Sequence, residues 1–237
     1  MIQQMAKLLQ EFLAEEMTEA EVSDRMIFEI NQMSTNFNMV WMAETGGKAL
    51  ATAVSPFEIG RFNIEIDYAD EYKQQLCFNP KDGKSAEEKF SFKLYIAQQL
   101  AGTIVGRNQK VKGFLQSYFY RVMQIYGENY YLYEVGFGAK GLYLCIYKED
   151  QLIAIVDKPL KVVNYRDKYI VYCLEEDNIK AIFPLVLQYD MTEHGDIAEV
   201  SLRSVKVKRV NTIQKELIAK YDPNFIPMIK QRDGVVE

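Results

Sequence analysis

The chain has 237 residues, 49% hydrophobic and 13% aromatic, so it can bury a sizeable core as one large or two small domains. Its six prolines and 13 glycines exclude a low-complexity or collagen-like protein. A formal net charge of −5 argues against a general nucleic-acid binder, because such a protein needs a positive surface to release counterions from phosphates.

Residues 1–33 are predicted to form two amphipathic helices. Apolar side chains recur at steps of three and four residues from Ile2 to Met17, and Thr18 with Glu21 matches a capping box that would start the second helix. The side chains that this second helix would bury are Val22, Met26, Ile27, Ile30 and Met33. Residues 1–30 contain two basic and seven acidic side chains, a balance that disfavours anchoring on an anionic membrane. The helices would therefore pack on the chain's own body or on a partner, a homodimer included.

The pattern of residues 34–60 does not favour one type of secondary structure. Asn36–Met42 fits a short strand and Gly46-Gly47 a turn, while Lys48–Val54 fits either a helical turn or a strand.

From Phe62 the apolar period changes to two. Phe62, Ile64, Ile66 and Tyr68 alternate with polar residues, which is typical of a strand with one wet face. Short strand-like segments then follow at intervals of about ten residues, and we expect a turn at Arg107–Gln109. The clearest of these segments are Lys89–Ile96, Gly102–Val105, Val111–Tyr120, Tyr130–Gly136, Leu142–Tyr147, Gln151–Val156, Lys161–Val163 and Lys168–Leu174. This spacing favours an antiparallel sandwich or barrel over βαβ units.

Asn178–Tyr189 is apolar almost all the way round, with seven unbroken apolar residues from Ala181 to Leu187. A helix without a polar face belongs inside a core, and this one is too short to cross a bilayer. Pro184 conflicts with a helix here, since an interior proline costs about 3 kcal/mol unless it lies in the first turn. Two alternatives follow: a helix that starts at Pro184 and shifts downstream towards Leu185–Met191, or a strand over Ile179–Leu187.

After this segment, Ile197–Val210 is predicted to form one or two strands and Asn211–Lys220 a helix capped by Asn211. Pro223 and Pro227 would stop that helix, and the last residues would be exposed. The predicted organisation is a helical segment over 1–60, a β-rich barrel-like domain over 61–210 and a C-terminal helix with a tail over 211–237.

Two stretches, YLYEVGFGAKGLYLCIYKEDQLIAIVDKP from Tyr131 and RDKYIVYCLEEDNIKAIFPLVLQYD from Arg166, resemble the tubby-like superfamily. That group includes the tubby C-terminal domain, the phospholipid scramblases and the LURP-one-related proteins. The resemblance covers about residues 90–200 and lies in a strand–turn rhythm followed by a late apolar segment. It implies a closed antiparallel barrel around a hydrophobic helix. The predicted fold is therefore β-rich α+β, such a barrel preceded by amphipathic helices, with an antiparallel sandwich as the alternative.

Little in the sequence points to catalysis or metal binding. His194 is the only histidine, and Cys77, Cys145 and Cys173 lack chelating spacing, so we expect no metal site and no cofactor. Carboxylate pairs such as Glu149-Asp150 and Glu175-Glu176-Asp177 occupy predicted turns, and the sequence does not bring them together.

The clearest charged feature is the segment Ser201–Val210, in which basic and apolar residues interleave. On a strand it would present a basic outer stripe. Its candidate anion-binding residues are Arg203, Lys206, Lys208 and Arg209. A solvated strand whose lysines discourage edge pairing is the simpler interpretation.

The expected function is that of a non-enzymatic binding or scaffold protein. The tubby-like resemblance implies an anionic lipid head-group as ligand, with a protein partner as the other class. The alternative is a hydrolase that uses paired carboxylates in a cleft at the mouth of the barrel. No transmembrane run and no secretion signal is evident, so we expect a soluble, cytoplasmic protein.

Overall fold

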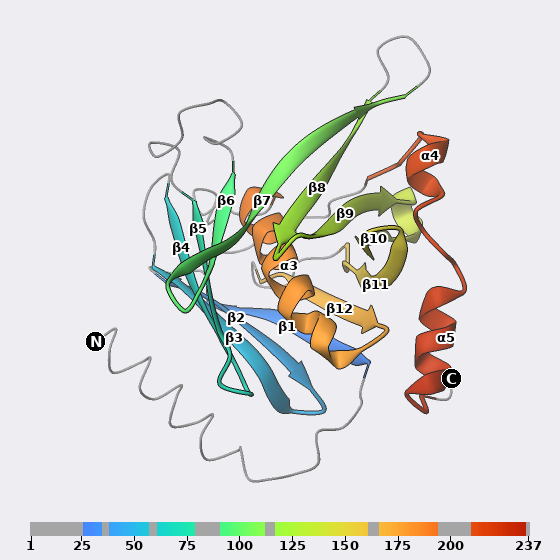
Figure 1. Cartoon of the computed structure of the whole chain (residues 1–237). Helices are drawn as coiled ribbons and strands as arrows, with labels where there is room; N and C mark the ends of the chain where they lie inside the picture. Colours follow the sequence, from blue (N-terminus) through green and yellow to red (C-terminus); the bar gives the residue numbers. More distant parts are fainter. Residues whose placement is uncertain are drawn as a thin grey trace.

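The computed structural model of the chain describes residues 26–34, 38–56, 61–78, 91–111, 117–160, 166–193 and 210–235. Within these ranges, twelve antiparallel strands form a closed barrel in which each strand pairs with the next and β1 pairs with β12 (Figure 1). The strands are β1 (Ile27–Ser34), β2 (Asn38–Thr45), β3 (Lys48–Pro56), β4 (Phe62–Tyr68), β5 (Lys73–Phe78), β6 (Phe92–Ile96), β7 (Gln99–Lys110), β8 (Ser117–Ile125), β9 (Glu128–Gly136), β10 (Leu142–Lys148), β11 (Gln151–Asp157) and β12 (Lys168–Cys173). The predicted barrel is confirmed, and the sandwich alternative is wrong.

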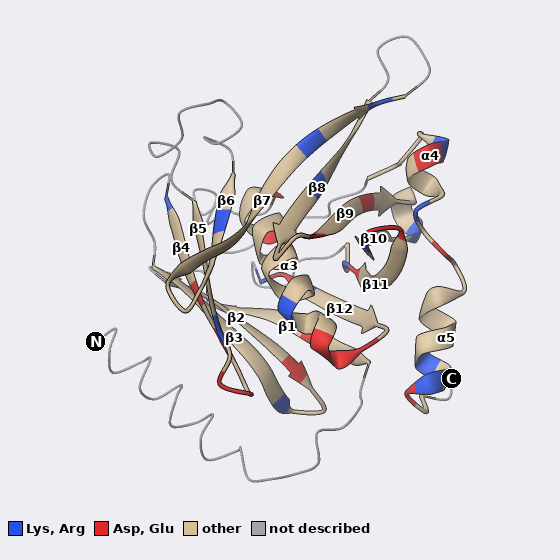
Figure 2. Cartoon of the chain, in the orientation of Figure 1, with Lys and Arg blue, Asp and Glu red and all other residues tan. Residues whose placement is uncertain are grey.

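A helix fills the barrel. After the short 3-10 turn η2 (Glu176–Asn178), α3 (Ile179–Glu193) runs through the centre of the strands (Figure 1). Its residues from Ala181 to Met191 are all buried, and its charged residues lie only near its two ends (Figure 2). The late apolar segment is therefore the predicted interior helix and not a strand.

Pro184 is accommodated because the barrel wall replaces a missing hydrogen bond. It is the sixth residue of α3, so the carbonyl of Lys180 has no N–H to accept from one turn later. The side-chain amide of Gln74 on β5 donates to that carbonyl at 3.0 Å, and the hydroxyl of Tyr68 donates to the other end of Gln74 at 2.7 Å. The wall thus satisfies the carbonyl that the proline leaves open.

The two ends of the barrel differ. Short turns such as Gly46-Gly47, Tyr126-Gly127 and Glu149-Asp150 close one end, which we call the turn end. At the other end, which we call the mouth, β9 ends, β8 begins and α3 finishes at Glu193. The buried polar residues Arg121, Lys158 and Asp167 lie at the mouth.

Two short helices cover the outside of the barrel. α4 (Lys215–Ile218) and α5 (Phe225–Arg232) pack over β9–β12, where Leu217, Phe225 and Ile229 bury an outer apolar cluster (Figure 1). Among the described residues, no helix combines the length and the apolar character that a bilayer crossing requires.

Several predictions about the N-terminal part are corrected. The helix expected over residues 18–33 is wrong from Ile27 onward, because β1 lies there and closes the barrel between β12 and β2. Residues 38–56, within the segment expected to be helical, form β2 and β3, so the barrel begins well before residue 61. The helix expected over residues 1–17, and dimerisation through it, lie outside the described residues.

Three further predictions fail later in the chain. The turn expected at Arg107–Gln109 is absent, since β7 runs unbroken through it and pairs with β8 to Lys110. Asn211 caps no helix: it forms a bridge with Phe137, and only Lys215–Ile218 are helical. Pro227 does not stop a helix, because it lies in the first turn of α5, where its missing N–H costs nothing. The strands expected at Lys161–Val163 and Ile197–Val210 fall almost wholly outside the described ranges.

Candidate functional site

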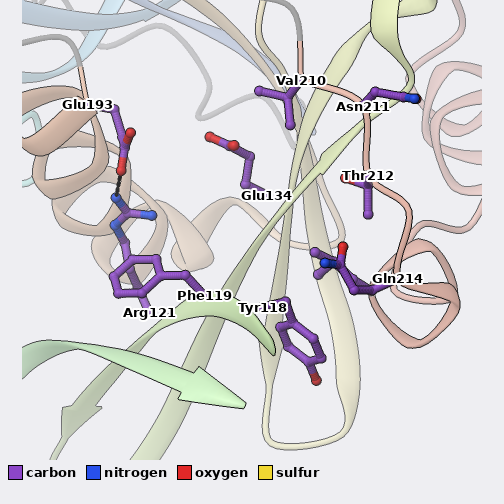
Figure 3. Close-up of a pocket in the computed structure, with 10 residues that line it drawn as sticks. Tyr118, Phe119, Arg121, Glu134, Glu193, Val210, Asn211, Thr212 and Gln214 are labelled. Atoms are coloured by element: carbon purple, nitrogen blue, oxygen red, sulfur yellow. Dashed lines mark hydrogen bonds and ion pairs between the residues drawn. The ribbon is translucent and has the colours of Figure 1, made fainter. Parts of the chain in front are cut away.

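The mouth carries a pocket of 460 Å³ (Figure 3). Its wall combines Tyr118, Phe119 and Arg121 of β8 with Glu134 of β9, Glu193 at the end of α3, and residues from Val210 to Leu217. Chain segments far apart in the sequence therefore meet here. α3 fills the centre of the barrel, and the pocket lies beyond its last turn, where inward-facing residues of β8 and β9 line it.

The segment Val210–Thr212, which we call the roof of the pocket, is held on β9 by close backbone contacts. Gly136 exchanges hydrogen bonds with Thr212, whose N–H donates to the Gly136 carbonyl at 2.9 Å and whose hydroxyl accepts from the Gly136 N–H at 2.9 Å. A Cβ on Gly136 would lie 2.2 Å from the carbonyl oxygen of Val210, so this approach requires glycine.

Arg121 is the buried cation of the site, with a side chain only 3% exposed. Its position on β8 is in phase with the interior residues Met123 and Ile125, which directs it into the barrel. One terminal nitrogen donates to Glu193 Oε1 at 2.7 Å and to Thr192 Oγ1 at 3.0 Å. These contacts tie β8 to the last turn of α3, where a positive charge also complements the helix dipole.

Two aromatic rings lie against the same guanidinium. Its central carbon is 5.1 Å from the centroid of Phe119 and 4.8 Å from that of Tyr189. The Nε of Arg121 has no hydrogen-bond partner among the described residues, and neither has the buried Oε1 of Gln188. Arg121 is thus held firmly between β8 and the last turn of α3.

Glu134 faces the same space from β9. It lies in phase with the interior residues Tyr130 and Leu132, and Arg121 pairs with Leu132 across the strands, so Arg121 and Glu134 are diagonal neighbours on one face. The hydroxyl of the buried Tyr189 donates a hydrogen bond to Glu134 Oε2. Burial, followed by the nearby Glu134 charge, raises the pKa of Tyr189, so this hydroxyl keeps its proton. In Figure 3 the carboxylates of Glu134 and Glu193 and the Arg121 guanidinium point toward one another.

A second buried polar cluster surrounds Asp190. Trp41 Nε1 donates to one of its carboxylate oxygens at 2.8 Å, and the hydroxyl of Tyr169 donates to the other at 2.5 Å. Lys158, over the ring of Tyr169, is paired with the buried Asp167. Burial raises the pKa of Asp190 above its usual value, and that of Tyr169 well above. Asp190 is 1% exposed, so this cluster supports the fold and offers no surface to a ligand.

The residues singled out from the sequence lie elsewhere. Arg203, Lys206, Lys208 and Arg209 fall outside the described residues, as does His194, although Val210, directly after Arg209, lies in the pocket wall. The carboxylates Glu149-Asp150 and Glu175-Glu176-Asp177 lie at the turn end. In the described part of the chain, no group of three or more His, Cys, Asp and Glu side chains is placed to hold a metal ion.

Sequence reasoning missed Arg121 and Glu134, although a signal for them exists. Each is a charged residue at an inward-facing position of a strand, and its neighbours two residues away in the same phase are apolar. Such a residue is expensive to bury unless it is paired, so an in-phase charge marks a polar site inside a barrel.

No family model matches the chain, and the searches of curated proteins and of solved structures found no significant match.

Proposed function

We propose that the chain is a non-enzymatic binding protein of the tubby-like kind, with the mouth of the barrel as its recognition surface. The observation that carries this proposal is the pocket that Arg121, Glu134 and Glu193 line above the end of α3. The closed barrel around a late helix is also the architecture that the tubby-like resemblance implied.

The pocket favours binding over catalysis because its carboxylates are occupied as acceptors. Glu193 accepts from Arg121, and Glu134 accepts from Tyr189. A general acid must instead present its own proton to a substrate, in hydrogen-bond reach of the leaving group.

For the ligand we retain the class expected from the sequence, an anionic lipid head-group bound by Arg203, Lys206, Lys208 and Arg209, with a protein partner as the other class. The support is continuity of the chain: these residues end one position before Val210 in the pocket wall.

Co-sedimentation with vesicles tests this. Binding to phosphatidylserine-containing vesicles is expected to exceed binding to pure phosphatidylcholine vesicles and to weaken as salt rises. The double substitution Lys206→Glu with Lys208→Glu should abolish it. The matched control is Lys73→Glu with Lys148→Glu, the same change in charge at the turn end, where each lysine forms a surface ion pair. Equal sedimentation with both vesicle types would contradict the lipid version and leave a protein partner.

One observation favours a second candidate, the hydrolase. The two glutamates that line one pocket meet the minimum requirement of carboxylate-pair hydrolysis. Turnover of a panel of aryl glycosides, lost in both Glu134→Gln and Glu193→Gln, would support it. An inactive wild-type protein would count against it.

A further inference from the structure

We infer that the outer face of β8, β9 and β10 binds a proline-rich segment of a partner protein in the polyproline II conformation, with tyrosine hydroxyls donating to its main-chain carbonyls. This site lies on the outside of the barrel wall and goes beyond the mouth surface of the proposed function. We call it the tyrosine face, and its members are Tyr118 and Tyr120 of β8, Tyr131 and Tyr133 of β9, and Tyr147 of β10.

The first step is the arrangement of the rings. All five lie out of phase with the inward-facing residues of their strands. Strand pairing sets Tyr120 opposite Tyr133. It also sets Tyr131 opposite Tyr147. The ring of Tyr133 is stacked with those of Tyr120 and Tyr131, at centroid distances of 5.4 and 6.3 Å. Tyr118 and Tyr147 meet the same ring edge-on, at 6.4 and 5.8 Å. The five rings therefore form one continuous aromatic surface, the kind on which polyproline II peptides dock.

The second step is exposure. The outer apolar cluster under α4 and α5 continues into the tyrosine face, since Tyr133 belongs to it and is 8% exposed (Figure 1). Just after α4, the ammonium of Lys220 lies 4.8 Å from the ring centroid of Tyr133. The rings of Tyr118, Tyr120 and Tyr131, further from this border, are half-buried. That part of the face is therefore open to a partner.

The third step is hydrogen bonding. Within the described ranges, the hydroxyl of Tyr147 is the only one of the five with an acceptor in the protein, and this acceptor is the main-chain carbonyl of Lys220 at 3.0 Å. Burial, followed by the neighbouring tyrosines, raises the pKa of Tyr133, and burial also raises the pKa of Tyr118 and of Tyr131. These hydroxyls consequently keep their protons and can donate. The contact of Tyr147 with Lys220 shows, within the protein itself, a hydroxyl of this face donating to a peptide carbonyl.

The fourth step is the chemistry of the partner. A polyproline II segment makes no internal hydrogen bonds, and its prolines have no N–H, so it offers carbonyl acceptors and apolar rings. The tyrosine face offers the complement, hydroxyl donors set in an aromatic surface. A preformed extended segment also loses little conformational entropy on binding.

Two other classes of ligand fit less well. The carboxylates of Glu149 and Asp150 lie close enough to Tyr131 to act on its hydroxyl electrostatically, and they would repel the phosphates of a single-stranded nucleic acid. A carbohydrate stacks its ring on an open aromatic face, whereas the rings of Tyr120 and Tyr133 are already stacked on each other.

Fluorescence polarisation on the full-length protein tests the inference with labelled probes. Fluorescein-labelled decaproline should bind at least about tenfold more tightly than a five-fold Gly-Ser repeat of the same length, which lacks proline rings and loses more conformational entropy. A labelled ten-nucleotide oligothymidine and labelled cellohexaose represent the other two classes. Tighter binding of either than of decaproline would overturn the inference.

The variants test the hydroxyls separately from the rings. Tyr120→Phe with Tyr131→Phe removes two hydroxyls, keeps both rings and should weaken decaproline binding about tenfold. The matched control is Tyr95→Phe with Tyr126→Phe, which removes two hydroxyls from β6 and from the turn after β8 and should leave binding unchanged. Tyr120→Ala removes a ring and should also weaken binding. Thermal unfolding of each variant shows whether it remains folded.

Equal affinities for decaproline and the Gly-Ser repeat, or an unchanged affinity in the double phenylalanine variant, would overturn the inference. Vesicle binding separates this outcome from failure of the proposed function. Vesicle binding without peptide binding removes only the present inference, whereas peptide binding without vesicle binding removes only the lipid version of that function.

Discussion

At the scale of single residues, Gln74 stabilises a helix to which it does not belong. Its amide gives the Lys180 carbonyl the hydrogen bond that Pro184 denies it, and its own carbonyl is held by Tyr68. All of this takes place at a position that is 4% exposed, where an unsatisfied carbonyl has no access to water.

Replacing Gln74 by leucine should therefore destabilise the protein by about 1–3 kcal/mol, because it leaves the Lys180 carbonyl and the Tyr68 hydroxyl without partners. Pro184→Ala restores an N–H inside α3 that can donate to the same carbonyl. In urea unfolding, the double variant should consequently lose less than the sum of the two single losses, by about 1 kcal/mol. Strict additivity would show that Gln74 does not act through this carbonyl.

Asp190 makes stability depend on pH. Burial raises its pKa in the folded protein above the unfolded value of about 3.9, so between these two values the folded state holds more protons than the unfolded state. Its contribution to stability is therefore fully present in acid and declines as pH rises through the folded pKa.

The variant Asp190→Asn removes this titration. Chemical unfolding at a series of pH values should show the free-energy advantage of the wild type over Asp190→Asn decreasing as pH rises. An advantage that grows with pH would contradict this assignment. The variant should also be less stable overall, because an amide offers one acceptor oxygen to the two donors Trp41 and Tyr169.

Residue patterns in the sequence predicted interior faces well and polar sites poorly. The alternation of Ile64, Ile66 and Tyr68 identified an inward face correctly. Arg121 and Glu134 obey the same alternation, but their partners lie on a third element, α3. Arg121 donates to Glu193, and Glu134 accepts from Tyr189. Sequence distance does not reveal such a contact.

At the scale of elements, the approach of Val210 to β9 depends on Gly136. Gly136→Ala places a methyl group against the backbone of Val210 and should displace the roof of the pocket, since backbone cannot move aside as a side chain can. We expect a lower melting temperature. Gly127→Ala, at a turn-end site where a Cβ meets nothing within 4 Å, should cost only the backbone strain of its positive φ and lower the melting temperature less.

The elements that the sequence failed to predict share a physical cause. Ile27, Ile30 and Met33 fit a helical spacing, yet β1 forms because the barrel needs a strand between β12 and β2 to satisfy both edges. β7 passes through Arg107–Gln109 because β8 offers partners along its whole length. In both cases tertiary hydrogen bonding overrides the local pattern.

At the scale of the whole molecule, α5 protects part of the outer wall. Cys145, on β10, is fully buried in the outer cluster, and burial raises the pKa of its thiol. The double substitution Phe225→Ala with Ile229→Ala should loosen α5 and make this thiol react faster with an aromatic disulfide reagent. Met228→Ala, at a 39% exposed position of the same helix, is the control and should leave the rate unchanged. Equal rates in all three proteins would show that α5 does not shield the thiol.

The architecture as a whole was more predictable than its parts. Evenly spaced strands predicted a sandwich or a barrel, and the segment without a polar face predicted a buried element at Asn178–Tyr189. The closed barrel around a helix was what the tubby-like resemblance implied. Closure between β1 and β12 was not predictable, because these strands lie more than a hundred residues apart and pair only once the barrel is complete. β8 and β9 form one hairpin, and the closed barrel encloses α3 so that its end meets that hairpin at the mouth pocket.

The position of α3 in the chain sets an order of events during synthesis. All twelve strands leave the ribosome before the helix that fills them, so the nascent barrel has apolar inner walls and nothing to pack on them. Folding from the N-terminus during synthesis therefore cannot complete the core, which forms only after residue 191 has emerged from the ribosome. Stalled nascent chains that end at Asp177 should remain sensitive to protease, whereas chains long enough to release α3 should become resistant. Until that moment the newly made strands are an aggregation hazard, and chaperone binding to the nascent chain should end abruptly as α3 enters.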